Sequence, residues 1–444
     1  MPVKDTPIDS TVVDRLIGES EIPHIGRASI REMVALINKI EAATGEKYLR
    51  MEMGVPGLKP PAVGVEAEIA AIRQGVGSVY PNIEGVEELK RETARFAKLF
   101  MNIDVEPEGC FPTVGNMQGV MACFMVLNRT DKRKEGTLFL DPGFPVQKLQ
   151  AKILGHTYES FDIYAYRGKK LREKLESYLK TGKISTILYS NPNNPTWMCL
   201  AEQELQIIGD LANAYDVIVI EDLAYFGMDF RKDISEPGVP PYQATVAKYT
   251  DNYVVLISGS KAFSYAGQRT GLMIISNRIQ NRRYPDLKRY FTTDRVGYAM
   301  VYGALYTLSA GTCHSAQHGL AAILKSANDG EYDFIGDVRV YGERAASAKK
   351  MFERHGFKIE YDKDIDEPLA DGFFFTISFP GFSGEQLLER LLYYGISAIA
   401  LYNTGADKTG GLRACVSQIS EDQLDVLEQR LKKFKEQQLE LRGA

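Results

Sequence analysis

The chain of 444 residues has little cysteine, histidine and tryptophan, and these shortages exclude several classes of protein. Its five cysteines are odd in number and form no C-x-x-C pair, which excludes a disulfide framework and the common zinc motifs. The five histidines are dispersed; His314 and His318 stand four residues apart, but no acidic residue nearby completes a metal-ligand set. We therefore expect reduced thiols and no metal.

Long basic runs and long apolar runs are also missing. The net charge is −5, and this mildly acidic balance argues against nucleic acid or an anionic membrane as a partner, because no long basic run exists to displace counterions. No stretch approaches the roughly 20 apolar residues that cross a bilayer, and Met1 to Asp5 open no signal peptide. These absences predict a cytoplasmic protein without nucleic-acid or membrane partners.

What is present is typical of a large globular enzyme. Apolar residues make up 44% and charged residues 25% of the chain, enough for two or more domains. Apolar runs near 137–140, 184–189, 217–221, 253–258 and 271–276 alternate with helical patterns such as 87–100 and 202–213. This alternation predicts an α/β fold, with helices on a mainly parallel sheet and ligand groups at the strand ends.

The most informative segment is Ser258-Gly259-Ser260-Lys261, which follows the apolar run Tyr253 to Ile257. A lysine at the end of a buried strand is poorly hydrated, so its pKa should fall and its amine becomes a nucleophile that can hold an aldehyde as a Schiff base. The serines and Arg269 are suitable donors to a phosphate. Taken alone, the segment is equally compatible with an ordinary strand-to-loop turn.

Two upstream segments favour the chemical interpretation. The run 184–189 leads into Asn191-Pro192-Asn193-Asn194-Pro195-Thr196, where two prolines hold Asn194 in a defined turn. The run 217–220 delivers Asp222 and Tyr225 at its carboxyl end. A buried carboxylate is costly unless it is paired, and a protonated pyridine nitrogen would pair with Asp222.

In order and spacing, Asn194-Pro195-Thr196, Asp222 with Tyr225, Ser258-x-Ser260-Lys261 and Arg269 resemble the class I/II pyridoxal-phosphate aminotransferases, which include aspartate aminotransferase. The resemblance extends from about Gly54 to Gln418. It implies pyridoxal 5'-phosphate as the cofactor, the fold of type I pyridoxal-phosphate enzymes, and a homodimer.

The resemblance also assigns roles. Lys261 would hold the aldehyde, Asp222 the ring nitrogen, and Asn194 with Tyr225 the phenolic oxygen. The phosphate would be bound by Ser258, Ser260, Arg269 and the backbone of Gly115, Asn116 and Met117, and Phe144 would stack on the ring. Arg413 and Gly54 would face the α-carboxylate of the substrate, with Asn194, and Tyr80 would reach the phosphate of the neighbouring subunit.

Two segments depart from the family pattern. Trp197, the only tryptophan, follows Asn194-Pro195-Thr196 where the family usually has glycine. The loop Ala400 to Gly405 lacks the usual proline-glycine ahead of the carboxylate arginine. Both departures leave the geometry near the substrate open.

The chain is expected to divide into three parts. Residues 59–325 would form the large, three-layer domain that binds pyridoxal phosphate, and 326–444 a smaller α+β domain. The resemblance places residues 1–58 as an N-terminal segment packing with the small domain. A capping box at Ser420 to Gln423 predicts the start of the last helix.

The implied activity is transfer of an amino group from an L-amino acid to a 2-oxo acid through a Lys261 Schiff base. A β-eliminating lyase, such as a cysteine-sulfur lyase, uses the same cofactor residues and stays open, as does a non-catalytic regulator with this fold. The stretch Tyr302 to Gly311 contains no basic residue, and Arg295 is the nearest arginine before it. We therefore expect neutral amino donors to be preferred over aspartate.

Overall fold

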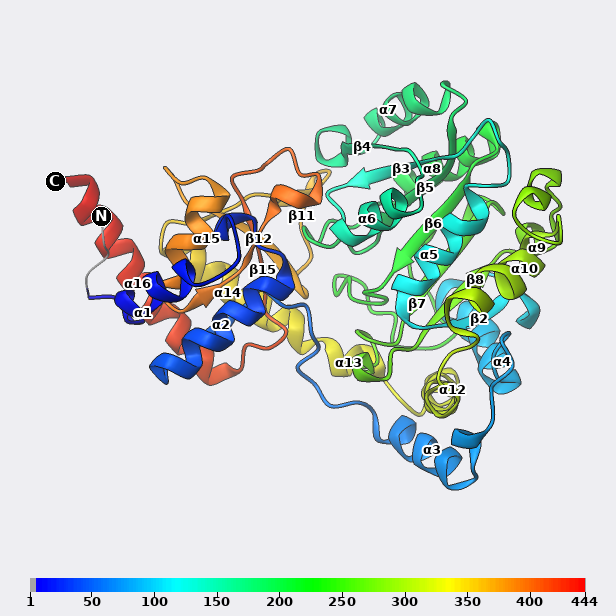
Figure 1. The fold of residues 1–444 in the computed structure, drawn as a ribbon, viewed down its shortest axis with the longest axis horizontal. Helices are drawn as coiled ribbons and strands as arrows, with labels where there is room; N and C mark the ends of the chain where they lie inside the picture. The colour runs from blue at the N-terminus through cyan, green and yellow to red at the C-terminus, as the bar shows by residue number, and fades with distance from the viewer. Residues whose placement is uncertain (1–4, 444) are drawn as a thin grey trace.

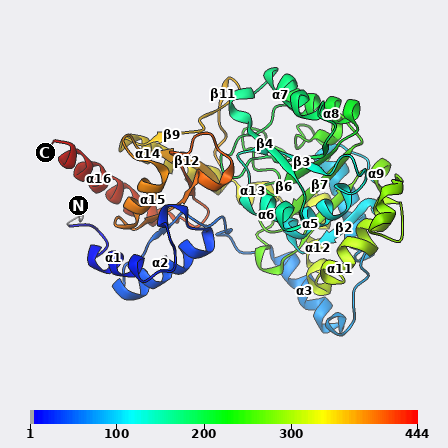
Figure 2. The same ribbon diagram turned by 45° about the horizontal axis from the view of Figure 1, so that its top comes forward.

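The computed structural model describes residues 5–443 and contains two main sheets. Residues 1–4, on which the expectation of no signal peptide rests in part, and Ala444 lie outside the described range. Figures 1 and 2 show the larger sheet with its helices on one side and the smaller sheet with both chain termini on the other. Within residues 5–443 no helix is long and apolar enough to span a membrane.

The larger sheet has seven strands and is mainly parallel, as predicted. Five neighbouring strands are parallel, and only β8 runs antiparallel to its neighbours. In spatial order the strands are β2 (Cys110–Thr113), β8 (Gly271–Ile275), β7 (Tyr253–Ser258), β6 (Ile218–Leu223), β5 (Ile184–Ser190), β3 (Gly136–Asp141) and β4 (Tyr158–Asp162). The sequence did not predict β4, an edge strand with exposed polar residues, or the short β2, which contains Pro112.

Helices cover both faces of this sheet. Ile187 and Val255 belong to one hydrophobic cluster, whereas their neighbours Leu188 and Val254 belong to another. Since successive side chains of a strand point to opposite faces, both faces are buried and the unit has three layers. The helices of eight or more residues in this part of the chain are α3 (Ala62–Arg73), α4 (Glu87–Phe96), α5 (Gly115–Leu127), α6 (Pro145–Ile153), α7 (Lys170–Leu179), α8 (Glu202–Tyr215) and α12 (His314–Asn328). Shorter ones are α9 (Asn277–Asn281), α10 (Val296–Tyr298) and α11 (Tyr306–Ser309).

The smaller sheet has four antiparallel strands in the order β14 (Ile399–Ala400), β15 (Leu412–Cys415), β12 (Phe374–Ser378) and β9 (Lys358–Ile359). Around it lie α13 (Phe334–Val338), α14 (Val340–Arg354), α15 (Gly384–Leu392) and α16 (Glu421–Gly443), and a hairpin of β10 (Lys363–Asp364) and β11 (Glu367–Pro368). The backbone N–H of Ser420 donates to the Gln423 side chain at 3.1 Å, as expected for the predicted cap of α16.

The N-terminal helices α1 (Ser10–Gly18) and α2 (Ile30–Thr44) share a hydrophobic cluster with this smaller sheet. After them, β1 (Leu49–Arg50) pairs in parallel with β13 (Ile396–Ser397). Figure 1 shows the blue N-terminal helices beside the orange and red C-terminal ones. The chain therefore returns to its starting point after building the larger sheet. We call the larger sheet with its helices the large unit. The small unit is the smaller sheet with its helices and loops, the β10–β11 hairpin, and α1 and α2.

Candidate active site

The predicted site residues meet where the parallel strands end. Strands β5, β6 and β7 are neighbours, and their carboxyl ends lead to Asn194, to Asp222 with Tyr225, and to Lys261. Polar side chains that follow adjacent parallel strands lie at one edge of a sheet, which is where α/β proteins bind ligands. Arg413 reaches the same place from β15 of the small unit, because its guanidinium donates to Asn194 Oδ1 at 3.3 Å.

Asp222 is buried and held by two amide groups. Asn116 Nδ2 donates to one carboxylate oxygen at 2.7 Å, and Gln147 Nε2 donates to the other at 2.8 Å. Burial raises the pKa of Asp222 to about 6, and these hydrogen bonds limit the rise. The carboxylate is therefore ionised at neutral pH and ready to pair with a cation.

Gln147 was missed by the sequence interpretation, and Asn116 has a side-chain contact beyond its predicted backbone role. Gln147 lies in the first turn of α6, three residues after Phe144. Residues three apart share a helix face, so a polar residue at this spacing from a predicted ring-stacking residue was a usable signal. Phe144 itself is half-buried and immediately precedes α6.

Lys261 lies in the turn after β7, and its amine donates to the backbone carbonyl of Gly54. Burial lowers the pKa of Lys261 to about 8, as the sequence predicted. More neutral amine is then available near neutral pH than in a solvent-exposed lysine. Gly54 is required here, because a Cβ would lie 2.7 Å from Cζ of Phe374.

Arg413 is 4% exposed, and its guanidinium carbon lies 4.5 Å from the centroid of the Phe374 ring. Its Nη2 donates to the carbonyl of Glu52, while its Nε has no hydrogen-bond partner among residues 5–443. Burial lowers the pKa of Arg413. A buried cation without a carboxylate in ion-pair contact within the described chain is suited to binding an anionic ligand.

A second cluster of donors forms around the start of α5. Gly115 adopts φ 65°, and a Cβ there would lie 2.5 Å from Nη2 of Arg269. Arg269 Nη1 lies 3.4 Å from Ser260 Oγ, and Ser258 Oγ accepts from the Ser260 backbone at 3.1 Å. A helix N-terminus with a guanidinium and hydroxyls is a suitable phosphate site. Next to Asn116, the Met117 carbonyl accepts from Gln150 of α6 at 2.9 Å.

Tyr225 and Tyr80 differ sharply in their surroundings. Tyr225 is buried, and burial raises its pKa, partly offset by Arg413 and by a hydrogen bond with Asn194. Tyr80 is 89% exposed and lies between α3 and α4 on the surface. The structure thus brings together the predicted residues at the strand ends with Arg413, and leaves Tyr80 exposed at the surface.

The loop that departs from the family pattern closes over the ends of β3 and β4. The backbone N–H of Gly143 donates to the Thr404 carbonyl at 2.8 Å, and that of Asp407 donates to Asp162 at 2.9 Å. Gly405 adopts φ 80°, and a Cβ there would lie 2.0 Å from an Asp141 oxygen. The small unit therefore contacts the large unit beside Phe144.

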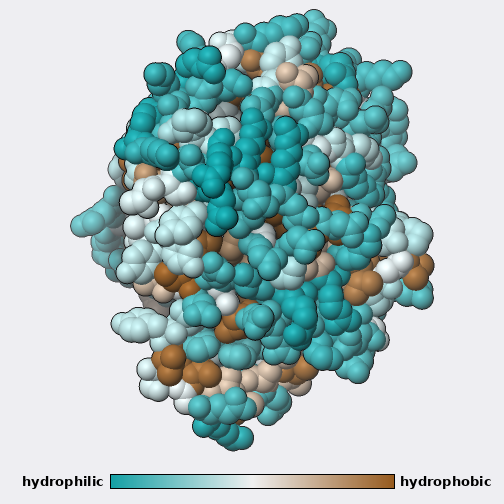
Figure 3. All heavy atoms as spheres, turned by 90° about the vertical axis from the view of Figure 1, so that its right-hand side faces the viewer, coloured by the Kyte–Doolittle hydropathy of each residue, from teal (hydrophilic) through white to brown (hydrophobic). Residues whose placement is uncertain are grey.

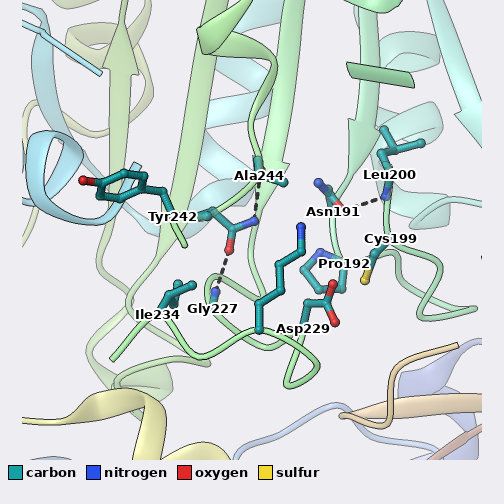
Figure 4. A pocket seen from close by; sticks show the side chains of 11 residues that line it. Asn191, Pro192, Cys199, Leu200, Gly227, Asp229, Ile234, Tyr242 and Ala244 are labelled. Atoms are coloured by element: carbon teal, nitrogen blue, oxygen red, sulfur yellow. Dashed lines mark hydrogen bonds between the residues drawn. The ribbon is translucent and has the colours of Figure 1, made fainter. Parts of the chain in front are cut away.

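A separate pocket lies beside the Asn191–Pro192 turn and includes Cys199, Asp229 and Gln243 (Figure 4). Its polar groups bind one another: Gln243 accepts from Gly227 N at 2.9 Å and donates to the Ala244 carbonyl at 3.0 Å. Asn191 accepts from Leu200 N at 3.1 Å. The predicted site residues do not line this pocket.

Comparison with known proteins agrees with this geometry. The chain is 23% identical over 353 residues to a probable aspartate aminotransferase of Methanocaldococcus jannaschii, covering 75% of this chain and 88% of that protein. It is 22% identical over 330 residues to an LL-diaminopimelate aminotransferase of Natranaerobius thermophilus, covering 73% and 76%. Its fold matches an alanine aminotransferase from Pyrococcus furiosus with a TM-score of 0.74, at 19% identity and covering 93% and 98% of the two chains. The model of the family "Aminotransferase class I and II" matches residues 46–431, and this chain therefore belongs to the class I and II aminotransferases, a family of transaminases that uses pyridoxal phosphate.

Proposed function

We propose that this aminotransferase binds pyridoxal 5'-phosphate and moves an amino group from an L-amino acid to a 2-oxo acid, with Lys261 as its catalytic amine. The observation that carries this proposal is the meeting of three groups at one sheet edge: the amine of Lys261, the carboxylate of Asp222 and the buried guanidinium of Arg413. They match the aldehyde and ring nitrogen of the cofactor and the carboxylate of an amino acid.

The residues present fit this cofactor. Asp222 is a buried carboxylate that lacks a cationic side chain among its hydrogen-bond partners in the described chain, as expected for a partner of a pyridinium nitrogen. Gly115 leaves room beside Arg269 that a Cβ would fill, at the end of the site where we place the phosphate. When bound, pyridoxal phosphate supplies an aldehyde carbon for the amino group and a ring that takes up electrons from the α-carbon.

The protein's own groups then have distinct tasks. Arg413 holds the α-carboxylate and so orients the α-carbon toward Lys261. Lys261 Nζ, with its pKa lowered by burial, removes the α-proton and later returns a proton. Asp222 keeps a positive charge at the ring nitrogen, and Asn194 with Tyr225 binds the phenolic oxygen. Buried aromatic rings around these groups exclude water.

Transfer is preferred over the β-eliminating alternative. The curated relatives that we compared are named as aminotransferases, for aspartate and for LL-diaminopimelate among others. A transaminase requires a 2-oxo acid acceptor, whereas a cysteine-sulfur lyase would release pyruvate and ammonia without one. Acceptor dependence therefore separates the two reactions.

The exposed surface near Tyr80 supports a homodimer. Three tyrosines are at least 41% exposed: Tyr298 on α10, Tyr302 on the π-helix Ala299–Leu305 that follows it, and Tyr306 on α11. Figure 3 shows this face of the molecule, where hydrophobic side chains gather mainly in the lower half. Burial of this face against a second copy would cover the tyrosines, and Tyr80 would reach the phosphate of the neighbouring site.

We also propose a division into domains and a cytoplasmic location. We place the cofactor domain at 59–325 and the small domain at 326–444 with the segment 1–58. Helix α12 ends at Asn328, so a boundary at 325 falls in its last turn. All five cysteines are free, four of them buried, which favours a reducing cytoplasm.

Reduction with borohydride followed by peptide mapping tests the proposal directly. We expect a pyridoxyl group on Lys261 in the wild type and none in Lys261→Ala, whose turnover should fall by about 10⁴-fold. A panel of amino acids, assayed with and without a 2-oxo acid, defines the reaction. An adduct on a different lysine, or release of pyruvate and ammonia without an acceptor, would contradict the proposal.

A further inference from the structure

Trp197 joins the turn that carries Asn194 in the large unit to the start of β12 in the small unit. It stands three residues after Asn194 and is completely buried. Its backbone adopts φ 68°, in the left-handed region that is unfavourable for a residue with a Cβ. Such a conformation persists only where the surrounding structure holds it in place.

The packing of the indole explains how that conformation is held. Its ring lies nearly parallel to Phe373 of the small unit, at 6.4 Å between centroids and 13° between planes. It meets Phe374 edge to face at 5.9 Å, and Tyr225 at 5.1 Å. Trp197 therefore packs against the Tyr225 ring and against the start of β12 at the same time.

Gly372 is the matching feature on the small unit. A Cβ at Gly372 would lie 2.1 Å from Cε2 of Trp197, a distance that no packed side chain tolerates. The absence of a side chain at 372 thus allows the indole to lie directly against the backbone. The two positions form a complementary pair across the contact between the units.

A second contact holds the same turn to the small unit. The carboxylate of Asp364, in the β10–β11 hairpin, accepts from the backbone N–H of Cys199 at 3.0 Å and from Arg167 at 2.8 Å. The segment from Trp197 to Cys199 is therefore fixed at both ends, and a shift of the small unit cannot leave the indole unmoved.

The indole of Trp197 also supports the ring against which Arg413 packs. Phe374, which the indole supports, carries the guanidinium of Arg413 on its face at 4.5 Å and limits the space beside Gly54. Phe373 lies 5.7 Å from the Lys261 amine. One indole thus supports both rings that lie against the carboxylate-binding and proton-transferring groups.

We propose that Trp197 is a positioning residue for amino-acid binding. Together with Gly372 it fixes the position of Phe374 and Arg413 relative to Lys261. The substrate carboxylate is therefore bound only when the two units are correctly packed. This inference rests on the proposed role of Arg413 as the carboxylate-binding residue. A displacement of an orienting group by about 1 Å is enough to change turnover by orders of magnitude.

A double-mutant cycle on the holoenzyme tests the proposal. Trp197→Leu and Gly372→Ala should each raise KM, for the amino acid that the wild type uses best, by about 10-fold, with the cofactor Kd changed by less than about 2-fold. The double variant should be no worse than either single one, because leucine lacks the ring atoms that meet the new methyl group. Phe434→Leu, a matched loss of a buried aromatic ring in the small unit, should lower Tm and leave KM unchanged.

The apo protein gives an independent measurement. Trp197 is the only tryptophan, so tryptophan fluorescence, excited selectively over the tyrosines, reports on this contact alone. Gly372→Ala should shift its emission to longer wavelength. Unchanged KM in both single variants, effects that multiply in the double variant, or an unshifted emission would each overturn the inference. If Arg413→Lys left KM unchanged as well, the proposed role of Arg413 would fail; if it raised KM while the Trp197 and Gly372 variants did not, only this inference would fail.

Discussion

The ends of the site that we propose for the cofactor and for the substrate, called the cofactor end and the substrate end below, are built in different ways. At the cofactor end, Asp222 is held by Asn116 and Gln147, which all belong to the large unit. At the substrate end, Arg413 belongs to the small unit and depends on Asn194 and Trp197 of the large unit through direct and indirect contacts. Cofactor binding should therefore survive changes in the packing of the two units, whereas substrate binding should not.

The second difference concerns stability. The buried charges at the site are costly to the fold: burial lowers the pKa of Lys261 to about 8 and raises that of Asp222 to about 6. Elsewhere in the large unit, the buried Arg167 is paired, with Glu204 at 2.8 Å and with Asp364 of the small unit at 2.8 Å. Unpaired groups at one end of a sheet are typical of a site prepared for a charged ligand.

The largest expected effect is on the rate of proton removal, which we expect to depend on Asp222, whereas the affinity for the cofactor should depend on Arg269. In Asp222→Ala, proton removal should slow by about 10³-fold with cofactor saturating, because the ring nitrogen loses its counter-ion. Arg269→Ala should instead weaken cofactor binding by about 10- to 100-fold, since it removes a charged hydrogen bond. Single-turnover rates and cofactor titrations measure the two effects. Equal cofactor loss with normal single-turnover rates in both variants would remove the proposed division of roles.

The stability of the apo protein tests the free-energy cost of burying the Lys261 amine. Folding lowers the Lys261 pKa from 10.5 to about 8, so the folded state is penalised below pH 8 by about 3 kcal/mol, and the penalty disappears as pH rises toward 10.5. Lys261→Met should therefore stabilise the apo protein at pH 7 by up to about this amount, and the gain should shrink between pH 8 and 10.5. Urea unfolding at several pH values measures it.

Lys148→Met is the matched control for that experiment. Lys148 pairs with the buried carboxylate of Asp141, so removing its amine leaves a buried charge unpaired and should destabilise the protein. If both methionine variants changed stability in the same direction at pH 7, the Lys261 amine would not carry the predicted burial cost.

At the substrate end, Arg413→Lys should raise KM for the amino acid by about 10- to 100-fold, because lysine cannot bind a carboxylate through two parallel hydrogen bonds. The cofactor Kd should not change. Arg282→Lys, at a partly exposed pair with Asp216, is the control and should leave KM within about 2-fold of wild type. A rise in cofactor Kd that matched the rise in KM would show that the two ends are not independent.

The smallest expected effect concerns substrate choice. Tyr302 to Gly311 contains no basic residue to pair with a second carboxylate, so leucine, methionine or phenylalanine should exceed aspartate in kcat/KM by about 10-fold or more. Arg295, just before α10, is the arginine that could reverse this preference. A clear preference for aspartate that is lost in Arg295→Gln would identify it as the missing charge partner.

The sequence determined where Asn194, Asp222 and Lys261 lie relative to the strands of the large sheet. Apolar runs predict buried strands, and the polar residues that follow them must lie at the strand ends, so Asn194, Asp222 and Lys261 could be brought together before any coordinates were known. The reason is local: the strand and the group that it presents are neighbours in the chain, and parallel strands align their ends.

Tertiary structure decided the rest. Gln147 binds Asp222 from a helix 75 residues away in sequence, and Trp197 meets Gly372 from the other unit. The sequence marked Trp197 only as an unusual residue, and the loop from Ala400 to Gly411 gave no sign that it would dock on the ends of β3 and β4. Contacts of this kind depend on how segments far apart in the chain pack together. The residues next to either partner in the sequence do not indicate which residue it will contact.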